Sequence, residues 1–254
     1  MRYISFASGS SGNCGLLTDG STALLIDAGI SFKRLKERLK TQNMDIHDID
    51  AIFITHEHSD HIAGLPMLCK HTGIPIYLRG GTCRALTRSG KCGMENMRIY
   101  APEQELQFGG ITVRSMDTPH DAAEPVCLRF DGENGSLALL TDLGMVPESV
   151  ARFICGAKAV VLEFNHDVDM LRYGPYPTAL KQRILGGNGH LNNAYAAGFA
   201  RRLAEAGATQ FLLAHLSAEN NTAALAEKAF LSYVGTTVKM SVAPRDELSE
   251  VLTV

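Results

Sequence analysis

The stretch Ala51-Ile52-Phe53-Ile54-Thr55-His56-Glu57-His58-Ser59-Asp60-His61 carries the strongest chemical signal in the chain. Its first five residues are apolar or β-branched and predict a buried strand. Residues i and i+2 of an extended segment point the same way, so His56 and His58 would leave the strand end side by side, able to hold one ion. Asp60 and His61 follow where the chain must turn into an expected helix. They would face a second, adjacent ion position.

Three other segments that read as buried strands each end in a further candidate ligand. These ligands are His120, after the alternating run 111–116, Asp142, after the apolar run 136–141, and His215, after the run 210–214. Open sheets place their ligand sites at strand ends. Imidazoles and carboxylates brought together there would repel and desolvate one another without a cation. The pattern therefore predicts one metal site that is fed from several strands.

This ligand set resembles the motif of the metallo-β-lactamase fold superfamily, His-x-His-x-Asp-His followed by a distant His, Asp and His, and all seven positions are matched. The resemblance implies two divalent metal ions, and zinc, manganese and iron all suit these donors. The implied ligands are His56, His58 and His120 for one ion, Asp60, His61 and His215 for the other, and Asp142 as the bridge. It also implies hydrolysis by a metal-bridging hydroxide, because metal coordination lowers the pKa of water to about 7.

Two features of the ligand set narrow the chemistry within this superfamily. None of the six cysteines occupies a ligand position. Many zinc β-lactamases use a cysteine in the second site, so antibiotic hydrolysis is disfavoured. Position 58 is His, where the di-iron flavoprotein branch commonly carries Glu, so reduction of oxygen or nitric oxide is disfavoured as well.

The length and patterning of the chain predict one α/β domain. A chain of 254 residues with 45% hydrophobic content can bury a large core, and without a long linker it is expected to form a single hydrolase domain over 1–254. The expected helices cover 31–41, 65–70, 83–88, 147–155, 177–185, 194–206 and 223–233. The expected strands cover 3–7, 14–18, 22–27, 51–55, 159–164 and 237–242, with a largely antiparallel set near 98, 111, 126 and 136. This order favours two packed sheets with helices outside, the four-layer αββα sandwich of the superfamily.

The start of the chain and its cysteines favour a cytoplasmic protein. Residues Met1-Arg2-Tyr3-Ile4-Ser5 do not predict a signal peptide, because polar Ser-Gly residues follow at once. No apolar run approaches the roughly 20 residues of a membrane span, so no membrane association is expected. The cysteines form no Cys-x-x-Cys pair and are expected to be reduced, mostly buried thiols: Cys14, Cys69, Cys83, Cys92, Cys127 and Cys155.

Two polar segments offer candidate substrate contacts, the loop 8–13 and the run 162–167. The candidates are Ser10, Ser11 and Asn13 from the first and Asn165 from the second. A Ser-Gly loop most often only reverses the chain, which is the alternative for the first segment. In the second, Glu163 ends a buried strand, where it would either orient a ligand imidazole or be an ordinary strand-end acid.

The segment Gly189-His190-Leu191-Asn192-Asn193 opens a predicted helix. A histidine at a helix start, among glycines, can donate to a phosphate oxygen or protonate a leaving group; the alternative for His190 is a capping role. In nucleases of the superfamily a Gly-His motif precedes the last metal histidine, and the order of His190 and His215 matches. Asn192 is a further candidate substrate contact. The candidate catalytic residues are Asp60, to orient the hydroxide, and His190, to assist the leaving oxygen.

Together these motifs resemble the bacterial YycJ branch, also called WalJ, over essentially the whole chain. That branch usually reads Gly-His-Leu-Ser-Asn in its last motif, so Asn192 is a small departure that affects one hydroxyl contact. The resemblance implies a metal-dependent phosphodiesterase that acts on DNA as a 5′ exonuclease. Only 72 residues separate Asp142 from His215, too few for the RNA-gripping domain of the larger β-CASP ribonucleases. Two divalent ions would bring the formal net charge from −3 to about +1 and concentrate positive potential at the cleft.

Two alternatives stay open. The first is a small-molecule hydrolase (cyclic phosphodiesterase, lactonase or thioesterase) with the same two-metal site; a carbonyl substrate would need an apolar pocket without phosphate-directed His190, Lys181 or Arg183. The second is a non-catalytic metal-binding protein, which the complete ligand set disfavours. The basic face of the helix 31–41 could contact a nucleic-acid backbone, but a charge run on a helix is usually a solvated face. No protein partner is implied.

Overall fold

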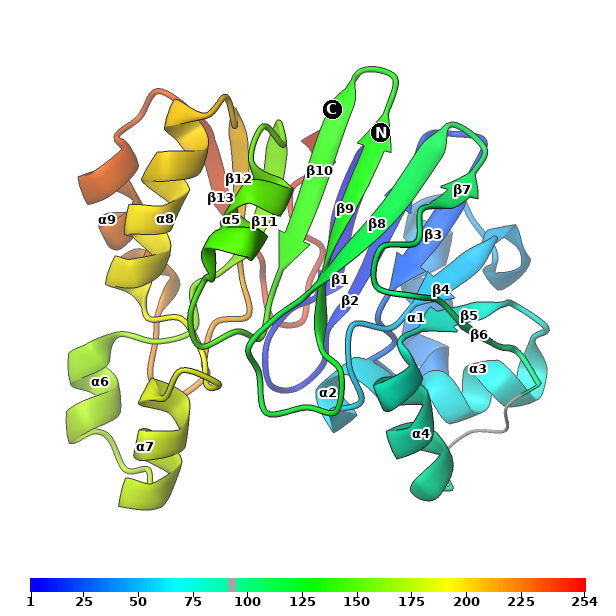
Figure 1. The fold of residues 1–254 in the computed structure, drawn as a ribbon, viewed down its shortest axis with the longest axis horizontal. Coiled ribbons are helices and arrows are strands. Elements are labelled where there is room, and N and C mark those ends of the chain that lie inside the picture. Colours follow the sequence, from blue (N-terminus) through cyan, green and yellow to red (C-terminus); the bar gives the residue numbers. More distant parts are fainter. Residues whose placement is uncertain (91–94) are drawn as a thin grey trace.

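Two β-sheets packed face to face, with helices on their outer faces, form the body of the protein (Figure 1). The structure is a computed structural model and describes residues 1–90 and 95–254. Three layers of buried apolar side chains hold the assembly together, one between the sheets and one between each sheet and its helices. The arrangement confirms the predicted four-layer αββα sandwich.

The first sheet positions the motif that contains four of the candidate ligands. Its strands are Arg2–Ala7 (β1), Cys14–Thr18 (β2), Ala23–Ile26 (β3), Ala51–Phe53 (β4), Ile76–Leu78 (β5), Met97–Ile99 (β6) and Leu252–Thr253 (β14). They are hydrogen-bonded in the order β14-β1-β2-β3-β4-β5-β6. β3 to β6 run parallel, so their carboxyl ends share one edge. The histidine motif follows β4 at this edge.

The second sheet brings the distant ligands to the same place. Its strands are Leu106–Phe108 (β7), Ile111–Asp117 (β8), Val126–Gly132 (β9), Gly135–Leu140 (β10), Ala159–Glu163 (β11), Gln210–Ala214 (β12) and Lys239–Val242 (β13). The order is β13-β12-β11-β10-β9-β8-β7. β10 to β13 are parallel, whereas β7 to β10 are antiparallel. Asp142 and His215 therefore follow the carboxyl ends of two parallel strands, β10 and β12, that flank β11.

Most helices pack on the outer face of one of the two sheets, and two of them lie below the second sheet (Figure 1). They are Phe32–Thr41 (α1), Ser59–Ile62 (α2), Leu65–His71 (α3), Gly80–Arg88 (α4), Glu148–Ile154 (α5), Val168–Tyr173 (α6), Thr178–Leu185 (α7), Asn193–Glu205 (α8) and Ala223–Val234 (α9), with a 3-10 turn at Ile46–Asp48. Apolar residues of α1, α3 and α4 pack on the first sheet, and those of α5, α8 and α9 on the second. Figure 1 shows α6 and α7 below the second sheet, near the edge where β10 ends. Every residue of α7 is at least partly exposed.

Helices α1 and α8 each follow a polar residue whose side chain accepts a hydrogen bond from the first turn. The side chain of Ser31 accepts a hydrogen bond from the backbone N–H of Arg34 and so caps the start of α1. Asn192 does the same for α8 through the N–H of Tyr195. These bonds satisfy N–H groups that the first helical turn leaves without intrahelical partners.

The structure departs from the sequence-based expectation in a few places. The strand near 98 is β6, parallel to β5 in the first sheet, so its assignment to the antiparallel set was wrong. The strands β5, β7 and β14 and the helix α6 were not predicted. Each of these strands has two or three residues, too few for alternation to be recognised.

The cysteines only partly match their expected state. Cys14, Cys83, Cys127 and Cys155 are free, and the first three are buried. Cys69 is disulfide-bonded, so the expectation of a reduced thiol is wrong for this residue. Cys92 lies outside the described residues. Among the helices of the described ranges, none has the length and apolar character needed to cross a bilayer.

The layer between the sheets can be tested by removing one of its side chains. Leu212 on β12 is fully buried in that layer. Leu212→Ala should lower the free energy of unfolding by about 2–5 kcal/mol, because the side chain leaves a cavity in a packed core. Leu231→Ala, on the half-exposed side of α9, should change it by about 0.5 kcal/mol or less. Urea titration measures both, and equal small losses would contradict a closed inter-sheet core.

Candidate metal centre

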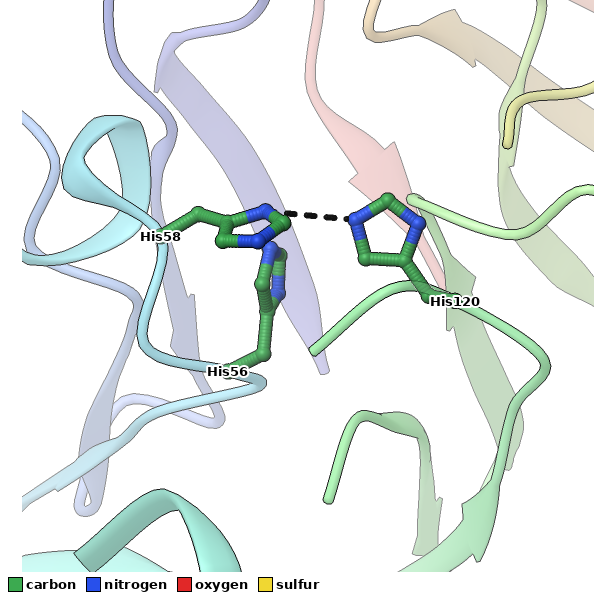
Figure 2. Close-up of side chains that lie close together, drawn as sticks. All are labelled: His56, His58 and His120. Carbon is green, nitrogen blue, oxygen red and sulfur yellow. Dashed lines mark hydrogen bonds between the residues drawn. The ribbon is translucent and has the colours of Figure 1, made fainter. Parts of the chain in front are cut away.

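Three imidazoles from both sheets converge on one point (Figure 2). His56 and His58 follow β4, and His120 lies in the loop after β8. His120 Nε2 is 3.3 Å from His58 Nδ1, and the centroid of the His56 ring is 4.6 Å from that of His58 and 5.1 Å from that of His120. One ring nitrogen from each histidine lies within 4.8 Å of the other two. This spacing suits three ligands of a single ion.

A second group forms beside the first. Asp60 and His61 belong to α2, and His215 follows β12. Asp60 Oδ2 is 3.5 Å from both His61 Nε2 and His215 Nε2. The three donor atoms again lie within 4.8 Å of one another. The structure thus brings together the set that the family resemblance implied for a second ion.

The carboxylate of Asp142 lies between the two groups. Its Oδ2 is 3.2 Å from His61 Nε2, and its Oδ1 is 3.4 Å from His215 Nε2 and 4.0 Å from His120 Nε2. A further cluster joins Asp142 to His56 and His61. The side chain is therefore in the place that a bridging ligand would need.

Two buried ligand atoms in this cluster lack a well-formed hydrogen bond within residues 1–90 and 95–254. They are His56 Nε2 and Asp142 Oδ2, and the second of them faces only an imidazole nitrogen, His61 Nε2, at 3.2 Å. Leaving buried polar atoms unpaired costs free energy, and nearly all such atoms in native proteins have a partner. A divalent cation would satisfy both atoms, and the nitrogen and oxygen donors present are those that such ions accept. The residues therefore fit a metal site.

Three of the candidate metal-binding histidines are each fixed by a hydrogen bond at Nδ1, which leaves Nε2 of each ring facing the cluster. Each ring donates through Nδ1: His61 to Asp27 Oδ2 at 2.7 Å, His120 to the carbonyl of Gly189 at 3.2 Å, and His215 to Glu163 Oε1 at 2.9 Å. Such outer hydrogen bonds fix the tautomer and the orientation of a metal-binding histidine.

Glu163 anchors both His215 and His190. The side chain is fully buried; Oε1 accepts from His190 Nδ1 at 2.8 Å, and Oε2 accepts from the N–H of Leu191 at 2.9 Å. Burial raises the pKa of this carboxyl, but the charge of His190 and the hydrogen bonds from His190 and His215 outweigh it and hold the pKa at about 2. Of its two sequence-based interpretations, the geometry favours the orienting acceptor.

The carboxylates of the cluster favour positive charge on the groups beside them. Burial and the nearby His61 lower the pKa of His56 well below its ordinary value. His61 is buried too, yet Asp27 and Asp142 raise its pKa well above that value. In the same way Asp142 outweighs burial and raises the pKa of His215 to about 10. The carboxylates thus retain protons on neighbouring rings, and bound cations would displace those protons.

The predicted substrate contacts occupy different surroundings. Asn13 Nδ2 is 3.1 Å from Asp60 Oδ2 and 3.0 Å from His61 Nε2, so this side chain braces the second group. Asn165 Nδ2 donates to the carbonyl of His215 at 3.1 Å. Asn192 is occupied in capping α8.

The two serines of the loop 8–13 differ in their relation to the centre. Ser10 lines a cavity of about 160 Å³ that also contains His190. Ser11 is exposed, and no hydrogen bond links it to the cluster in the described part of the chain.

The basic side chains considered as phosphate contacts form hydrogen bonds or ion pairs with other residues of the chain. Lys181 Nζ donates to the carbonyls of Arg172 and Gly174, each at 2.8 Å, and Arg183 pairs with Asp121. On α1, Arg34 pairs with Asp246 at 2.9 Å. Lys181 is therefore not directed at a phosphate, and the basic face of α1 is partly neutralised.

Sequence reasoning missed two acids beside the cluster. Asp27 directly follows β3 and holds His61, so it carried the same signal as Asp142, an acid at the end of a buried strand. Asp121 is 3.5 Å from His120 Nε2 and 3.9 Å from His58 Nε2 through its Oδ1. Its place next to His120 in the sequence was its only signal.

The fold and the donor set define the class of protein as a metal-dependent hydrolase of the metallo-β-lactamase fold. Residues 22–216 match the family described as the beta-lactamase superfamily domain. The chain is 39% identical over 227 residues to "Exodeoxyribonuclease YycJ" of Bacillus anthracis, covering 89% of this chain and 86% of the relative. It is 38% identical to "Exodeoxyribonuclease WalJ" of Streptococcus pneumoniae, with coverage of 91% and 87%. The chain belongs to the β-lactamase superfamily and, within it, to the YycJ/WalJ family.

Solved structures confirm the fold. Zn(2+)-bound PqqB from Methylobacterium extorquens superposes with a TM-score of 0.74 at 18% identity, and all of both chains is covered. The metallo-beta-lactamase fold protein YhfI from Bacillus subtilis gives a TM-score of 0.73 at 20% identity, with coverage of 99% of this chain and 98% of YhfI. At such identities the likeness concerns the fold alone.

Removing the acid behind His61 tests the outer support of the centre. Asp27→Asn should weaken metal binding about 10–100-fold, because the amide cannot hold the Nδ1–H of His61 as a carboxylate does. Calorimetric titration with Mn(II) or Zn(II) measures the affinity. Asp169→Asn, an equivalent change at an exposed acid on α6, should leave it unchanged. Unaltered affinity in Asp27→Asn would remove Asp27 from the site.

Proposed function

We propose that this chain is a dinuclear metal-dependent phosphodiesterase that acts on DNA as a 5′ exonuclease. The family relationship supports a nuclease, since both relatives described above are named exodeoxyribonucleases. The observation that carries the proposal is the position of His190. Its ring centroid is 5.2 Å from that of His120 and 5.3 Å from that of His215, and its Nδ1 is 3.7 Å from Asp142 Oδ1.

The proposed metal ligands divide as their geometry suggests. One ion would be held by His56, His58 and His120, the other by Asp60, His61 and His215, with Asp142 shared between them. Zinc and manganese suit these donors, and iron suits them as well. When bound, the ions would supply a hydroxide nucleophile at neutral pH and positive charge beside the scissile phosphate.

Asp60 and His190 would act on the reacting atoms themselves. The Asp60 carboxylate is held by Asn13, and hydrogen bonds from His215 and His61 keep its pKa well below the usual range although burial raises it. It can therefore accept a hydrogen bond from the attacking group and orient it. His190 gives its Nδ1–H to Glu163, which leaves Nε2 to face a phosphate oxygen or the leaving oxygen.

The proposal also covers the residues that contact the substrate, the extent of the domain and the location of the protein in the cell. We take Ser10, Ser11, Asn13, Asn165 and Asn192 as the residues nearest to the bound strand, residues 1–254 as one domain, and the cytoplasm as its location. Of the small-molecule alternatives, a carbonyl substrate is disfavoured by His190 with its carboxylate partner, whereas Lys181 and Arg183 do not contribute to this distinction because both are paired within the protein.

The activity can be tested directly on DNA. Purified protein with added Mn(II) should release mononucleotides from 5′-labelled single-stranded or duplex DNA, and excess chelator should stop the release. Asp142→Ala serves as the control for contaminating nuclease. Intact DNA in the presence of protein with measured bound metal would reject the exonuclease and favour a smaller phosphodiester or thioester substrate.

Two substitutions should separate metal binding from proton donation. Asp142→Ala should lose metal and activity together, because it removes the carboxylate between the two groups. His190→Ala should keep its metal and lose turnover by about 100-fold or more. Elemental analysis after dialysis and initial rates on DNA give the two readouts, with His47→Ala, at an exposed histidine, as the matched control. Full activity in His190→Ala would exclude this residue from the mechanism.

A further inference from the structure

A cavity of about 160 Å³ lies beside the candidate metal centre, with His190 in its wall. Its other walls come from the loop 8–13, from the segment 174–189 that contains α7, and from the loops that follow β8, β11 and β12. The volume is below the roughly 300–1,000 Å³ of pockets that enclose drug-sized ligands. It therefore suits one planar ring system rather than a whole nucleotide.

The charges on the walls favour a neutral occupant. Of the described residues that line the cavity, only Asp121, Arg183 and His190 can carry charge. Arg183 is paired with Asp121, and His190 is paired with Glu163, so no free cation faces the space from this set. A terminal phosphate would leave such a cavity with an unbalanced negative charge.

The other wall residues match the chemistry of a nucleobase. Tyr176, Leu180 and Ile184 provide an aromatic ring and apolar surface, and Ser10, Asn165 and Ser217 provide neutral polar groups. The side chain of Asn165 bonds to His215 through Nδ2, and its Oδ1 makes no hydrogen bond with the described residues. Bases are commonly held between aromatic or apolar side chains and neutral hydrogen-bonding groups.

We propose that this cavity holds the base of the terminal nucleotide, stacked on Tyr176, while His190 at its wall faces the scissile phosphate. The inference rests on the proposed nuclease function and adds a residue, Tyr176, that positions the terminal nucleotide. It places the released nucleotide on the α7 side of the centre. Its base is read by stacking, which tolerates any of the four bases.

The test compares two DNA strands that differ only in the base of the attacked end. One carries an ordinary terminal adenine nucleotide, and the other carries a stable abasic analogue at that position. With the Mn(II)-loaded protein, kcat/KM for removal of the first nucleotide should be about tenfold or more higher for the strand with the base. Equal rates on both strands would overturn the base pocket while leaving the nuclease function intact.

Substitutions identify the stacking partner. Tyr176→Ala should reduce kcat/KM on the ordinary strand to the abasic level and leave the rate on the abasic strand unchanged. Tyr176→Phe should retain the preference, because the ring remains. Tyr173→Ala is the matched control, since this tyrosine lies three positions earlier with 87% of its surface exposed and does not line the cavity.

Other outcomes overturn the proposal. If Tyr176→Ala slows both strands equally, or if Tyr173→Ala removes the preference, the cavity does not read the base. Thermal melting of each variant shows whether a loss reflects unfolding, and Tyr176→Phe tests the ring in a variant that differs by one hydroxyl. If the wild type cleaves neither strand with metal bound, the proposed function fails and this inference fails with it.

Discussion

Attraction between one buried carboxylate and the imidazoles on both sides of it is the interaction on which the centre depends. Asp142 leaves the second sheet, yet it lies 3.2 Å from His61, whose motif follows a strand of the first sheet. On its other oxygen it meets His215 at 3.4 Å. Burial alone would favour a neutral carboxyl, but the charges of His215 and His61 hold its pKa well below the usual range. The two sheets must therefore present their carboxyl ends at one edge, or this balance of charge is lost.

Strained backbone marks the same strand ends. Asp27, Asp142 and His215 have positive φ angles of 58°, 60° and 56°, a region that side chains other than glycine rarely adopt. Each such residue costs on the order of 1 kcal/mol or more and persists where the surrounding structure determines it. All three side chains belong to the centre or hold it directly. Each of the three residues lies within two positions of the end of a strand, so the unusual backbone coincides with the groups that build the centre.

Close backbone packing supports the turn that carries Asp60. The N–H of Asn13 donates to the carbonyl of Asp60 at 2.7 Å, and the N–H of Gly29 donates to the carbonyl of Asn13 at 2.8 Å. A Cβ at Gly29 would lie 1.6 Å from the Asp60 oxygen, so no larger residue fits there. The Gly-rich loop 8–13 thus contributes structure to the centre, which its sequence did not indicate.

The sequence predicted the parts of the site that depend on strand ends. His56, His58 and His120 could be placed in one metal site because alternating or apolar runs lead up to them, whereas their assignment to a single ion came from the family resemblance. The brace from Asn13 to Asp60 depends on a tertiary contact between residues 47 positions apart, and no local pattern encodes it. The three-residue strand β6 gave a strand signal but no information on its neighbour, so its sheet was assigned wrongly.

The hydrogen bond from His120 to the carbonyl of Gly189 ties the segment around His190 to the metal cluster. Substitutions in this segment are therefore more restricted than substitutions in the helices that precede it. The peptide that carries His190 also fixes a ring of the metal cluster, so an insertion or a larger residue there would disturb both at once; a Cβ at Gly189 would lie 2.2 Å from the carbonyl of Ile184. The preceding helices α6 and α7 contain none of the clustered metal donors among the described residues. If the cavity holds the base as proposed, substitutions in α7 would alter what the enzyme accepts while leaving every clustered metal donor in place.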